Sequence, residues 1–380
     1  MTDSEGPLRG VRVVEFASLA PGPFAGMLLA DMGADVVRVD RLEQAGSPGG
    51  LLLGRGRRSV AVDLKHAEGK AVALGLAERA DALIEGFRPG VMERLGLGPD
   101  VCLGRNPALV YGRMTGYGQE GPLAGAAGHD INYISLAGVL GMTGRAGQPP
   151  TPPLNLVGDF GGGGMVLAFG ILCGLIEARA TGRGQVVDAA MVDGASLLMA
   201  AFFGGGGPGR GWKDRGTNML DSGAPFYDAY ETADGRWVAV GAIEPQFYAE
   251  LLSGLGIDPA SLPPQMERGS WPDTKRRFAE LFRQHTRDEW CRRFEGTDAC
   301  VTPVLDLDEV EHHPHGAARS AYVEVAGVLQ PAPAPRLSAT PGRVRRPPPV
   351  VGGHTDEVLA EWTGLDRAGV EALRRAKAVA

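Results

Sequence analysis

The chain has 380 residues, a formal net charge of −7 and a hydrophobic content of 44%. This length exceeds what one compact domain usually holds, so we expect two domains. The negative charge and the lack of basic runs mixed with aromatic residues argue against a nucleic-acid-binding protein, so any anionic ligand must be held by a local cluster of cations.

The four cysteines, Cys102, Cys173, Cys291 and Cys300, are widely spaced and form no CxxC pair. We therefore expect neither a zinc site nor a disulfide framework, and a reducing compartment fits such thiols best. The sequence starts without a charged-then-apolar signal, contains no run of eighteen uninterrupted apolar residues and ends without a peroxisomal address. These features predict a cytoplasmic protein that does not bind a membrane.

The first forty residues alternate between strand and helix patterns. Residues 11–16 form a β-branched run that ends at the turn-forming residues 20–23. Residues 24–32 have the pattern of a buried helix that ends at Gly33, and residues 35–40 form a second short apolar strand. Strand, helix and strand within about thirty residues predict a βαβ unit with parallel strands and a right-handed crossover.

The same alternation continues to about residue 191. Further strands are expected at 59–64, 82–85, 109–114 and 185–191, with helices at 66–79 and from Gly162 to about residue 178. This order predicts an α/β fold with a doubly wound parallel sheet.

The second half predicts a smaller domain followed by a return to the first. Strands at 226–231 and 236–242 flank a hairpin turn, and helical patterns with aromatic residues follow. A proline-rich connector is expected at 331–349, and a last helix capped by Thr355 at 355–376. The expected organisation is a Rossmann-like large domain at 1–198, a linker at 199–224 that includes a glycine-rich run, a small α+β domain at 225–310, a linker at 311–335 and a return to the large domain at 336–380.

Four basic residues lie near strand ends, where open α/β sheets bind their ligands. Arg38 is near the end of the second strand, where an arginine suits an adenosine that carries an extra phosphate. Lys65 and Arg88 each follow a strand, and Arg94 comes six residues after Arg88. The GxGxxG fingerprint of dinucleotide binding is absent. These residues alone allow two interpretations: the basic side chains bind phosphate groups together, or each is an ordinary solvated surface charge.

Three further residues could carry or support a proton. His129 precedes a helix pattern, and histidine titrates near neutral pH. Asp159 precedes four glycines at the start of a long apolar helix, where bare N–H groups could hold an enolate oxygen; an ordinary N-cap is the alternative. Glu244 precedes Pro245 at a helix start, where a carboxylate also suits the helix dipole. The histidines within 312–315 predict a solvated linker, so no metal is expected.

These residues belong to strings that resemble the class III CoA-transferase superfamily. The strings are LADMGADVV at 29–37, DLK at 63–65, EGFRPG at 85–90, GYGQEGP at 116–122 and HTDEVL at 354–359. Three more strings, GHDINY at 128–133, NLVGDFGGG at 155–163 and GAIEPQFY at 241–248, resemble the racemase branch of that superfamily. Its members invert the α-carbon of 2-methylacyl-CoA thioesters.

The resemblance implies two catalytic bases, His129 supported by Glu244, and Asp159. It also implies an interlocked homodimer, in which the small domain of one subunit completes the active site of the other, and no cofactor beyond the coenzyme A of the acyl-CoA substrate. The implied coenzyme A site consists of Arg38, Val62, Asp63, Leu64, Lys65, Gly86, Phe87, Arg88, Arg94, Gly128, Asp130, Ile131, Asn132 and Tyr133.

The residues and the resemblance together predict a racemase that works by two-base proton transfer. A thioester acidifies its α-C–H because the charge spreads onto oxygen as an enolate, and inversion needs one base on each face of that carbon. Two alternatives stay open. One is a CoA-transferase in which Asp159 attacks an acyl thioester to form an anhydride. The other is an acyl-CoA-binding protein without catalytic activity.

Overall fold

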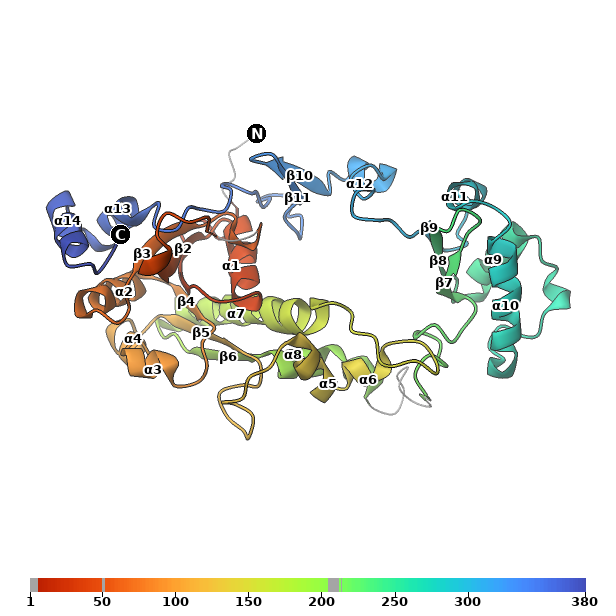
Figure 1. The fold of residues 1–380 in the computed structure, drawn as a ribbon, viewed down its shortest axis with the longest axis horizontal. Helices are drawn as coiled ribbons and strands as arrows, with labels where there is room; N and C mark the ends of the chain where they lie inside the picture. Colours follow the sequence, from red (N-terminus) through yellow and green to blue (C-terminus); the bar gives the residue numbers. More distant parts are fainter. Residues whose placement is uncertain (1–5, 50–51, 204–211, 213) are drawn as a thin grey trace. The chain divides into compact units, whose positions relative to one another are not determined.

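The computed structural model describes residues 6–49, 52–203, 212 and 214–380, so the expected glycine-rich part of the linker lies outside the described residues. The chain divides into two compact units, which are described separately (Figure 1). Unit 1 contains Met1–Ala137, Leu154–Met199 and His315–Ala380, and unit 2 contains Gly138–Pro153 and Ala200–Pro314. Residues 138–153 thus group with the second unit, in contrast to the expected boundaries.

Unit 1 is built on a parallel sheet of six strands in the order β3-β2-β1-β4-β5-β6 (Figure 1). All five adjacent pairs are parallel, which confirms the predicted α/β sheet. From β1 the chain adds β2 and β3 on one side of β1, and it then adds β4, β5 and β6 on the other side. The strand order therefore reverses between the neighbouring strands β1 and β4. The strands are β1 (Arg12–Phe16), β2 (Asp35–Arg41), β3 (Arg58–Val62), β4 (Ala82–Glu85), β5 (Val110–Thr115) and β6 (Val186–Ala190).

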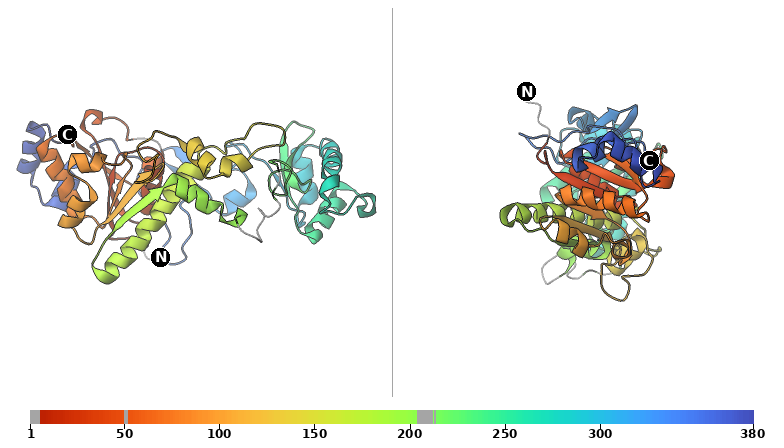
Figure 2. Two further views of the ribbon diagram at one scale, coloured as in Figure 1. Left: turned by 90° about the horizontal axis from the view of Figure 1, so that it is seen from below. Right: turned by 90° about the vertical axis from the view of Figure 1, so that its left-hand side faces the viewer.

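Helices cover both faces of this sheet (Figures 1 and 2). Successive strand residues point to opposite faces, so each face has apolar side chains that the helices bury. Val14 and Phe16 of β1 belong to the core with α2 (Ala67–Arg79), α13 (Thr355–Val358) and α14 (Arg367–Arg375). Val13 belongs to the core on the other face, with α1 (Pro21–Asp31) and α7 (Val166–Thr181). Unit 1 also contains the helices α3 (Val91–Leu95), α4 (Pro99–Arg105), α5 (Asp130–Leu136) and α8 (Met191–Leu198).

The C-terminal part of the chain differs from the prediction in two places. The expected linker at 311–335 contains α12 (Pro314–Ala318) and the hairpin of β10 (Tyr322–Val325) and β11 (Val328–Pro331). The single helix expected at 355–376 is divided by Gly364, whose φ of 74° lies in the left-handed region. Thr355 does not cap α13; its hydroxyl donates to the carbonyl of Gly352.

One long helical segment contains Asp159 near its start and packs on the sheet further along. A π-helix, Leu156–Met165, runs directly into α7. The stretch Leu156–Thr181 is long and apolar enough to cross a membrane by length and composition alone, yet 44% of its most apolar window is buried in the structure. Leu167 and Ile171 lie in the core against the sheet, whereas Phe169 and Ile176 are 68% and 71% exposed. This helix therefore has one buried and one exposed apolar face.

Unit 2 is a small α+β unit. Its antiparallel sheet contains β7 (Tyr227–Glu231), β8 (Trp237–Gly241) and β9 (Val301–Pro303) in that order. The helices are α6 (Val139–Met142), α9 (Pro245–Leu255), α10 (Trp271–Phe282) and α11 (Arg287–Phe294). The core is largely aromatic, and Tyr230 stacks on Phe282 with ring centroids 5.0 Å apart.

Candidate active site

The candidate site lies at the point where the strand order of the unit 1 sheet reverses. Open α/β sheets bind ligands at the carboxyl ends of their strands, next to such a reversal. In this sheet the reversal falls between β1 and β4. The segments that follow these two strands contribute Ala17 and Ser18 from one side and Gly86 and Phe87 from the other to a common cavity. The topology thus predicts the place where the cavity is found.

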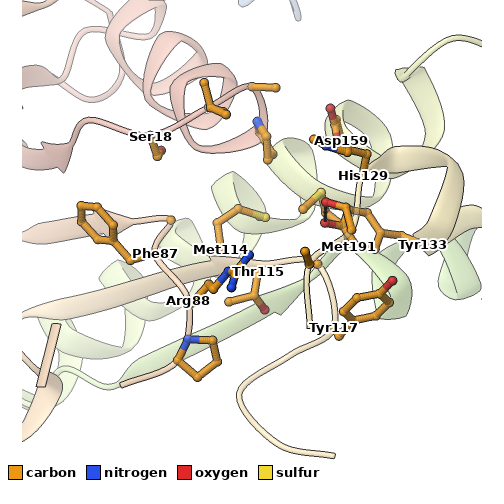
Figure 3. Close-up of a pocket in the computed structure, with 18 of the residues that line it drawn as sticks. Ser18, Phe87, Arg88, Met114, Thr115, Tyr117, His129, Tyr133, Asp159 and Met191 are labelled. Carbon is orange, nitrogen blue, oxygen red and sulfur yellow. Dashed lines mark hydrogen bonds between the residues drawn. The ribbon is translucent and has the colours of Figure 1, made fainter. Parts of the chain in front are cut away.

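The first cavity has a volume of about 440 Å³ and contains two of the predicted catalytic residues (Figure 3). Its polar side chains include His129, Asp159, Arg88, Thr115 and Arg41. Its apolar walls come from Leu19, Pro21, Phe87, Met114, Tyr117, Tyr133 and Met191. A cavity of this size with a few convergent polar groups suits a small ligand.

A second cavity, of about 600 Å³, shares the lining residues Ala17, Arg41 and Phe87 with the first. The two cavities therefore adjoin. The other lining residues are Phe16, Val39, Asp40, Glu43, Gln44, Val62, Asp63, Leu64, Lys65, Val91 and Leu95. The lining of the second cavity includes two cations, Arg41 and Lys65, and three carboxylates among its apolar residues. Together with the adjoining histidine and aspartate, this arrangement suits a ligand that has both an anionic part and a reactive end.

His129 occupies the N-cap position of α5 and is exposed at the first cavity. Its backbone N–H donates to the side-chain oxygen of Asn132, at 3.0 Å. This hydrogen bond fixes the start of the helix and leaves the imidazole on the cavity wall (Figure 3). Asn132 therefore supports His129 from within α5 and does not line either cavity.

Asp159 lies within the π-helix and is half-buried. The N-cap role considered from the sequence is wrong, because Asn155 occupies that position. The amide of Asn155 donates to Oδ2 of Asp159, at 3.0 Å. Burial and the nearby carboxylate of Asp130 raise the pKa of Asp159 above its ordinary value of 3.8, whereas Asn155 and His129 oppose that shift. A carboxyl group with a raised pKa is better suited to return a proton as well as remove one.

The glycines that follow Asp159 are explained by helix packing. A Cβ atom at Gly162 would lie 2.5 Å from the backbone nitrogen of Ala195 in α8, and one at Gly164 would lie 2.7 Å from the carbonyl oxygen of Pro21 in α1. The backbone N–H of Asp159 itself is already bonded to Asp130, at 2.8 Å. From the sequence we expected this run to present bare N–H groups to a ligand. The structure instead explains the glycines by their close contact with α1 and α8.

Two tyrosines form the wall next to His129. The rings of Tyr117 and Tyr133 meet edge to face, with centroids 5.0 Å apart. The hydroxyl of Tyr133 donates to the carbonyl of Gly128, and burial raises the pKa of Tyr133 to about 12. This phenol therefore stays protonated near neutral pH and holds the turn that carries His129.

Two residues of the predicted coenzyme A segment 128–133, Asp130 and Ile131, do not line the cavities. Asp130 is buried beneath Asp159, and Ile131 is 46% exposed.

The predicted cations separate into two groups. Lys65 lines the second cavity and Arg88 the first. Arg38 lines neither, because its side chain is 14% exposed, pairs with Asp40 at 3.0 Å and donates to the carbonyl of Gly49. Arg94 is exposed and also lies outside both linings.

Arg41 is the cation that the sequence analysis missed. It ends β2, is exposed and lines both cavities, and its side chain forms no ion pair or hydrogen bond with the described part of the chain. The sequence does contain a signal that favours Arg41 over Arg38, because side chains along a strand point alternately to its two faces. Residues 38 and 40 share a face, which favours an Arg38–Asp40 pair, whereas residue 41 points the other way.

The third predicted catalytic residue, Glu244, belongs to unit 2. It is the exposed N-cap residue of α9. The turn before it is held by the amide of Gln265, which donates to the carbonyls of Ala242 and Ile243 at 3.1 and 2.8 Å. Among the residues that the structure describes, no group of three His, Cys, Asp or Glu side chains is arranged to hold a metal ion.

Residues 8–355 of the chain match CoA-transferase family III. The chain is 53% identical to the alpha-methylacyl-CoA racemase of Mus musculus, with 93% of both proteins covered. It is 47% identical to the alpha-methylacyl-CoA racemase of Homo sapiens, over 98% of this chain and 97% of that one. Among solved structures, a hypothetical protein from Mycobacterium tuberculosis is similar with a TM-score of 0.76 and 30% identity, covering 93% of this chain and 99% of that one.

Proposed function

This chain belongs to CoA-transferase family III, and we propose that it is a racemase that inverts the α-carbon of 2-methylacyl-CoA thioesters. One observation carries the proposal. His129 and Asp159 line the same cavity, and that cavity adjoins a second one whose lining includes Arg41 and Lys65. The relatives named alpha-methylacyl-CoA racemase support the same activity.

The coenzyme A part of the substrate is assigned to the second cavity. Its wall includes Val62 at the end of β3 and the next three residues, Asp63, Leu64 and Lys65, and Phe87 lines both this cavity and the catalytic one. The phosphates of coenzyme A would meet Lys65, Arg88 and Arg41, since an arginine fork and an ammonium both bind phosphate oxygens well. We assign to Arg41 the contact that the sequence analysis gave to Arg38, because Arg38 is taken up by Asp40 and Gly49.

In the catalytic cavity, one base removes the α-proton and the other delivers a proton to the opposite face. The thioester carbonyl takes up the charge as an enolate, so the intermediate is planar at the α-carbon. His129 and Asp159 are suited to these roles because imidazole titrates near neutral pH and burial raises the pKa of Asp159 toward that range. In this account no cofactor is needed beyond the coenzyme A of the substrate.

We also propose that the active form is a homodimer, in which Glu244 of unit 2 supports His129 of the other subunit. A carboxylate that accepts a hydrogen bond from the imidazole would orient it and increase its basicity. Glu244 is exposed and fixed at a helix start, which suits such a role. The exposed apolar face of the helical segment Leu156–Thr181, with Met165, Phe169 and Ile176, supports a partner surface.

A cytoplasmic location is proposed from the thiols. Cys102, Cys173, Cys291 and Cys300 are all free, and free thiols are typical of a reducing compartment. We assign the apolar helix Leu156–Thr181 to the protein interior and the subunit contact, not to a membrane, because its buried face packs on the sheet.

The experiment is incubation of a single 2-methylacyl-CoA enantiomer with the protein in deuterated water, without any acceptor acid. A racemase produces the opposite enantiomer together with α-deuterium. A CoA-transferase leaves the configuration and the isotope at the α-carbon unchanged in every case, and it moves the coenzyme A to another acid only when an acceptor acid is added. A binding protein neither inverts the thioester nor transfers its coenzyme A. Absence of both inversion and α-deuterium in the experiment without an acceptor contradicts the proposed activity.

A further inference from the structure

One loop forms part of the wall of both cavities. Residues 86–90, called the coenzyme A loop here, connect β4 to α3. Phe87 lines both cavities and Arg88 lines the first. Val91 and Leu95, in the helix that follows, line the second. This loop therefore contributes to the walls of both cavities.

Arg113 holds both ends of the coenzyme A loop. It lies on β5 directly opposite Glu85, the last residue of β4. Its Nε donates to Oε1 of Glu85 at 2.9 Å, and its two terminal nitrogens donate to both carboxylate oxygens of Glu93 in α3, at 2.8 and 3.3 Å. One guanidinium thus joins the residue before the loop to the helix after it.

Glu85 extends this connection into the loop itself. Its second oxygen, Oε2, accepts the backbone N–H of Phe87 at 2.8 Å. The Glu85 side chain is 1% exposed, so water cannot replace these partners without local opening. Burial raises the pKa of Glu85, and the hydrogen bonds from Phe87 and Arg113 favour its ionised form. The chain of contacts runs from Arg113 through Glu85 to the backbone of Phe87.

Arg113 itself lines neither cavity and is 6% exposed. It therefore has no contact with a ligand in either cavity, and its influence must pass through the loop. The forked contact with Glu93 fixes the angle of α3 more tightly than a single charge would, because a guanidinium binds a carboxylate through two parallel hydrogen bonds. Loops held in the bound shape lose less conformational entropy when the ligand arrives.

We propose that Arg113 is a positioning residue that fixes the coenzyme A loop, and that it governs affinity for the coenzyme A part of the substrate without taking part in proton transfer. The inference rests on the proposed function for the identity of the ligand. It predicts that weakening the Arg113 contacts raises Kd for free coenzyme A and KM for the thioester together, while kcat of racemisation stays at its wild-type value.

The test compares Arg113→Lys and Glu93→Gln with a matched control. Arg113→Lys keeps the charge but removes the fork, and we expect Kd and KM to rise by about tenfold. Glu93→Gln weakens only the outer contact, whose carboxylate is 45% exposed, and we expect a rise of about threefold. The control is Glu78→Gln, which breaks the exposed pair with Arg105 and should leave both constants unchanged.

Calorimetry on free coenzyme A and steady-state racemisation give the two readouts. Proportional rises in Kd and KM at constant kcat support the positioning role. A fall in kcat with unchanged Kd and KM overturns it, as does an Arg113→Lys protein that matches the control in every constant. Should Arg113→Lys fail to fold, Glu93→Gln decides alone by the same criteria.

The two proposals fail in different ways. A wild-type protein that binds coenzyme A but does not racemise contradicts the proposed function and leaves the calorimetric test of Arg113 intact. A wild-type protein that racemises, with loop variants that bind coenzyme A normally, contradicts only the positioning role.

Discussion

The carboxylate of Asp130 accepts a hydrogen bond from the backbone N–H of Asp159, with 2.8 Å between Oδ1 and N. Asp130 is the first residue of α5 and follows His129 directly, so this contact ties the helix of one proposed base to the π-helix of the other. Gly158 makes the approach possible, since a Cβ atom there would lie 2.4 Å from the same oxygen. The spacing of the two bases thus depends on a buried polar contact.

Removing this contact should impair catalysis more than substrate binding. In Asp130→Ala the N–H of Asp159 loses its partner, which costs about 1–3 kcal/mol of stability for a buried donor. We expect kcat to fall by about tenfold to a hundredfold, because small displacements of catalytic groups are costly, with little change in KM. Asp130→Asn keeps an oxygen acceptor and should recover most of kcat in steady-state assays. Equal losses in the two variants would show that the hydrogen bond is not the cause.

The pH profile should report the environment of Asp159. Its pKa is raised mainly by burial and lowered by the hydrogen bond from Asn155. In the direction for which Asp159 removes the proton, the carboxylate must be ionised, so kcat/KM rises with pH through this pKa. Asn155→Ala removes a contact that favours the ionised form, and the acidic limb should move to higher pH. Asp130→Asn removes a nearby negative charge, and the limb should move to lower pH.

These opposite shifts are measured from initial rates with each pure enantiomer across the acidic range. Shifts of the same sign in both variants would contradict this description of the Asp159 environment.

Arg41 and Arg38 should behave differently when each is replaced. Arg41→Ala should weaken binding of free coenzyme A by about 1.5–3 kcal/mol, the usual contribution of a hydrogen bond to a charged group, and leave the melting temperature unchanged. Arg38→Met breaks a largely buried ion pair with Asp40 and should mainly lower the melting temperature. Arg79→Ala, which changes an exposed cation outside both cavities, is the control.

Calorimetry on coenzyme A and thermal unfolding separate these outcomes. An unchanged affinity in Arg41→Ala, together with a weakened one in Arg38→Met, would return the phosphate contact to Arg38.

The glycines after Asp159 should be sensitive to a single methyl group. In Gly162→Ala the new Cβ would meet the backbone of Ala195, which cannot move as a side chain can, so we expect a loss of about 1–3 kcal/mol in the free energy of unfolding. Gly104→Ala is the matched control, because Gly104 also lies in a helix but has open space around its Cβ position. That change should be neutral or stabilising by up to about 1 kcal/mol. Denaturant unfolding of both variants gives the comparison.

The strands and the large helices of unit 1 could be predicted from the sequence, because they follow simple patterns. Residues 35–40 and 82–85 are short apolar runs between turn signals, and the structure places strands there. The C-terminal segment 355–376 was harder to predict from the sequence. Its apolar residues suit one helix, but Gly364 adopts a left-handed conformation and divides it.

The site was predictable in its residue types and less so in its arrangement. His129 and Asp159 stand out by chemistry, but the π-helix around Asp159 cannot be read from a hydrophobic period that fits an α-helix equally well. The contact between Asp130 and Asp159 joins residues 29 positions apart and depends on tertiary packing. The choice of Arg41 over Arg38 needed the strand register, and the Arg113 network needed both neighbouring strands and α3.

The central claim, that His129 and Asp159 act on opposite faces of the α-carbon, is tested most directly by deuterium exchange in single-base variants. His129→Ala and Asp159→Ala are each incubated in deuterated water with the pure 2R and the pure 2S thioester, and α-deuterium is measured by mass spectrometry. Both variants should lose inversion, and each should exchange deuterium into one enantiomer only, through its surviving base. The account predicts that the exchanged enantiomer differs between the two variants. Exchange of the same enantiomer in both would contradict it.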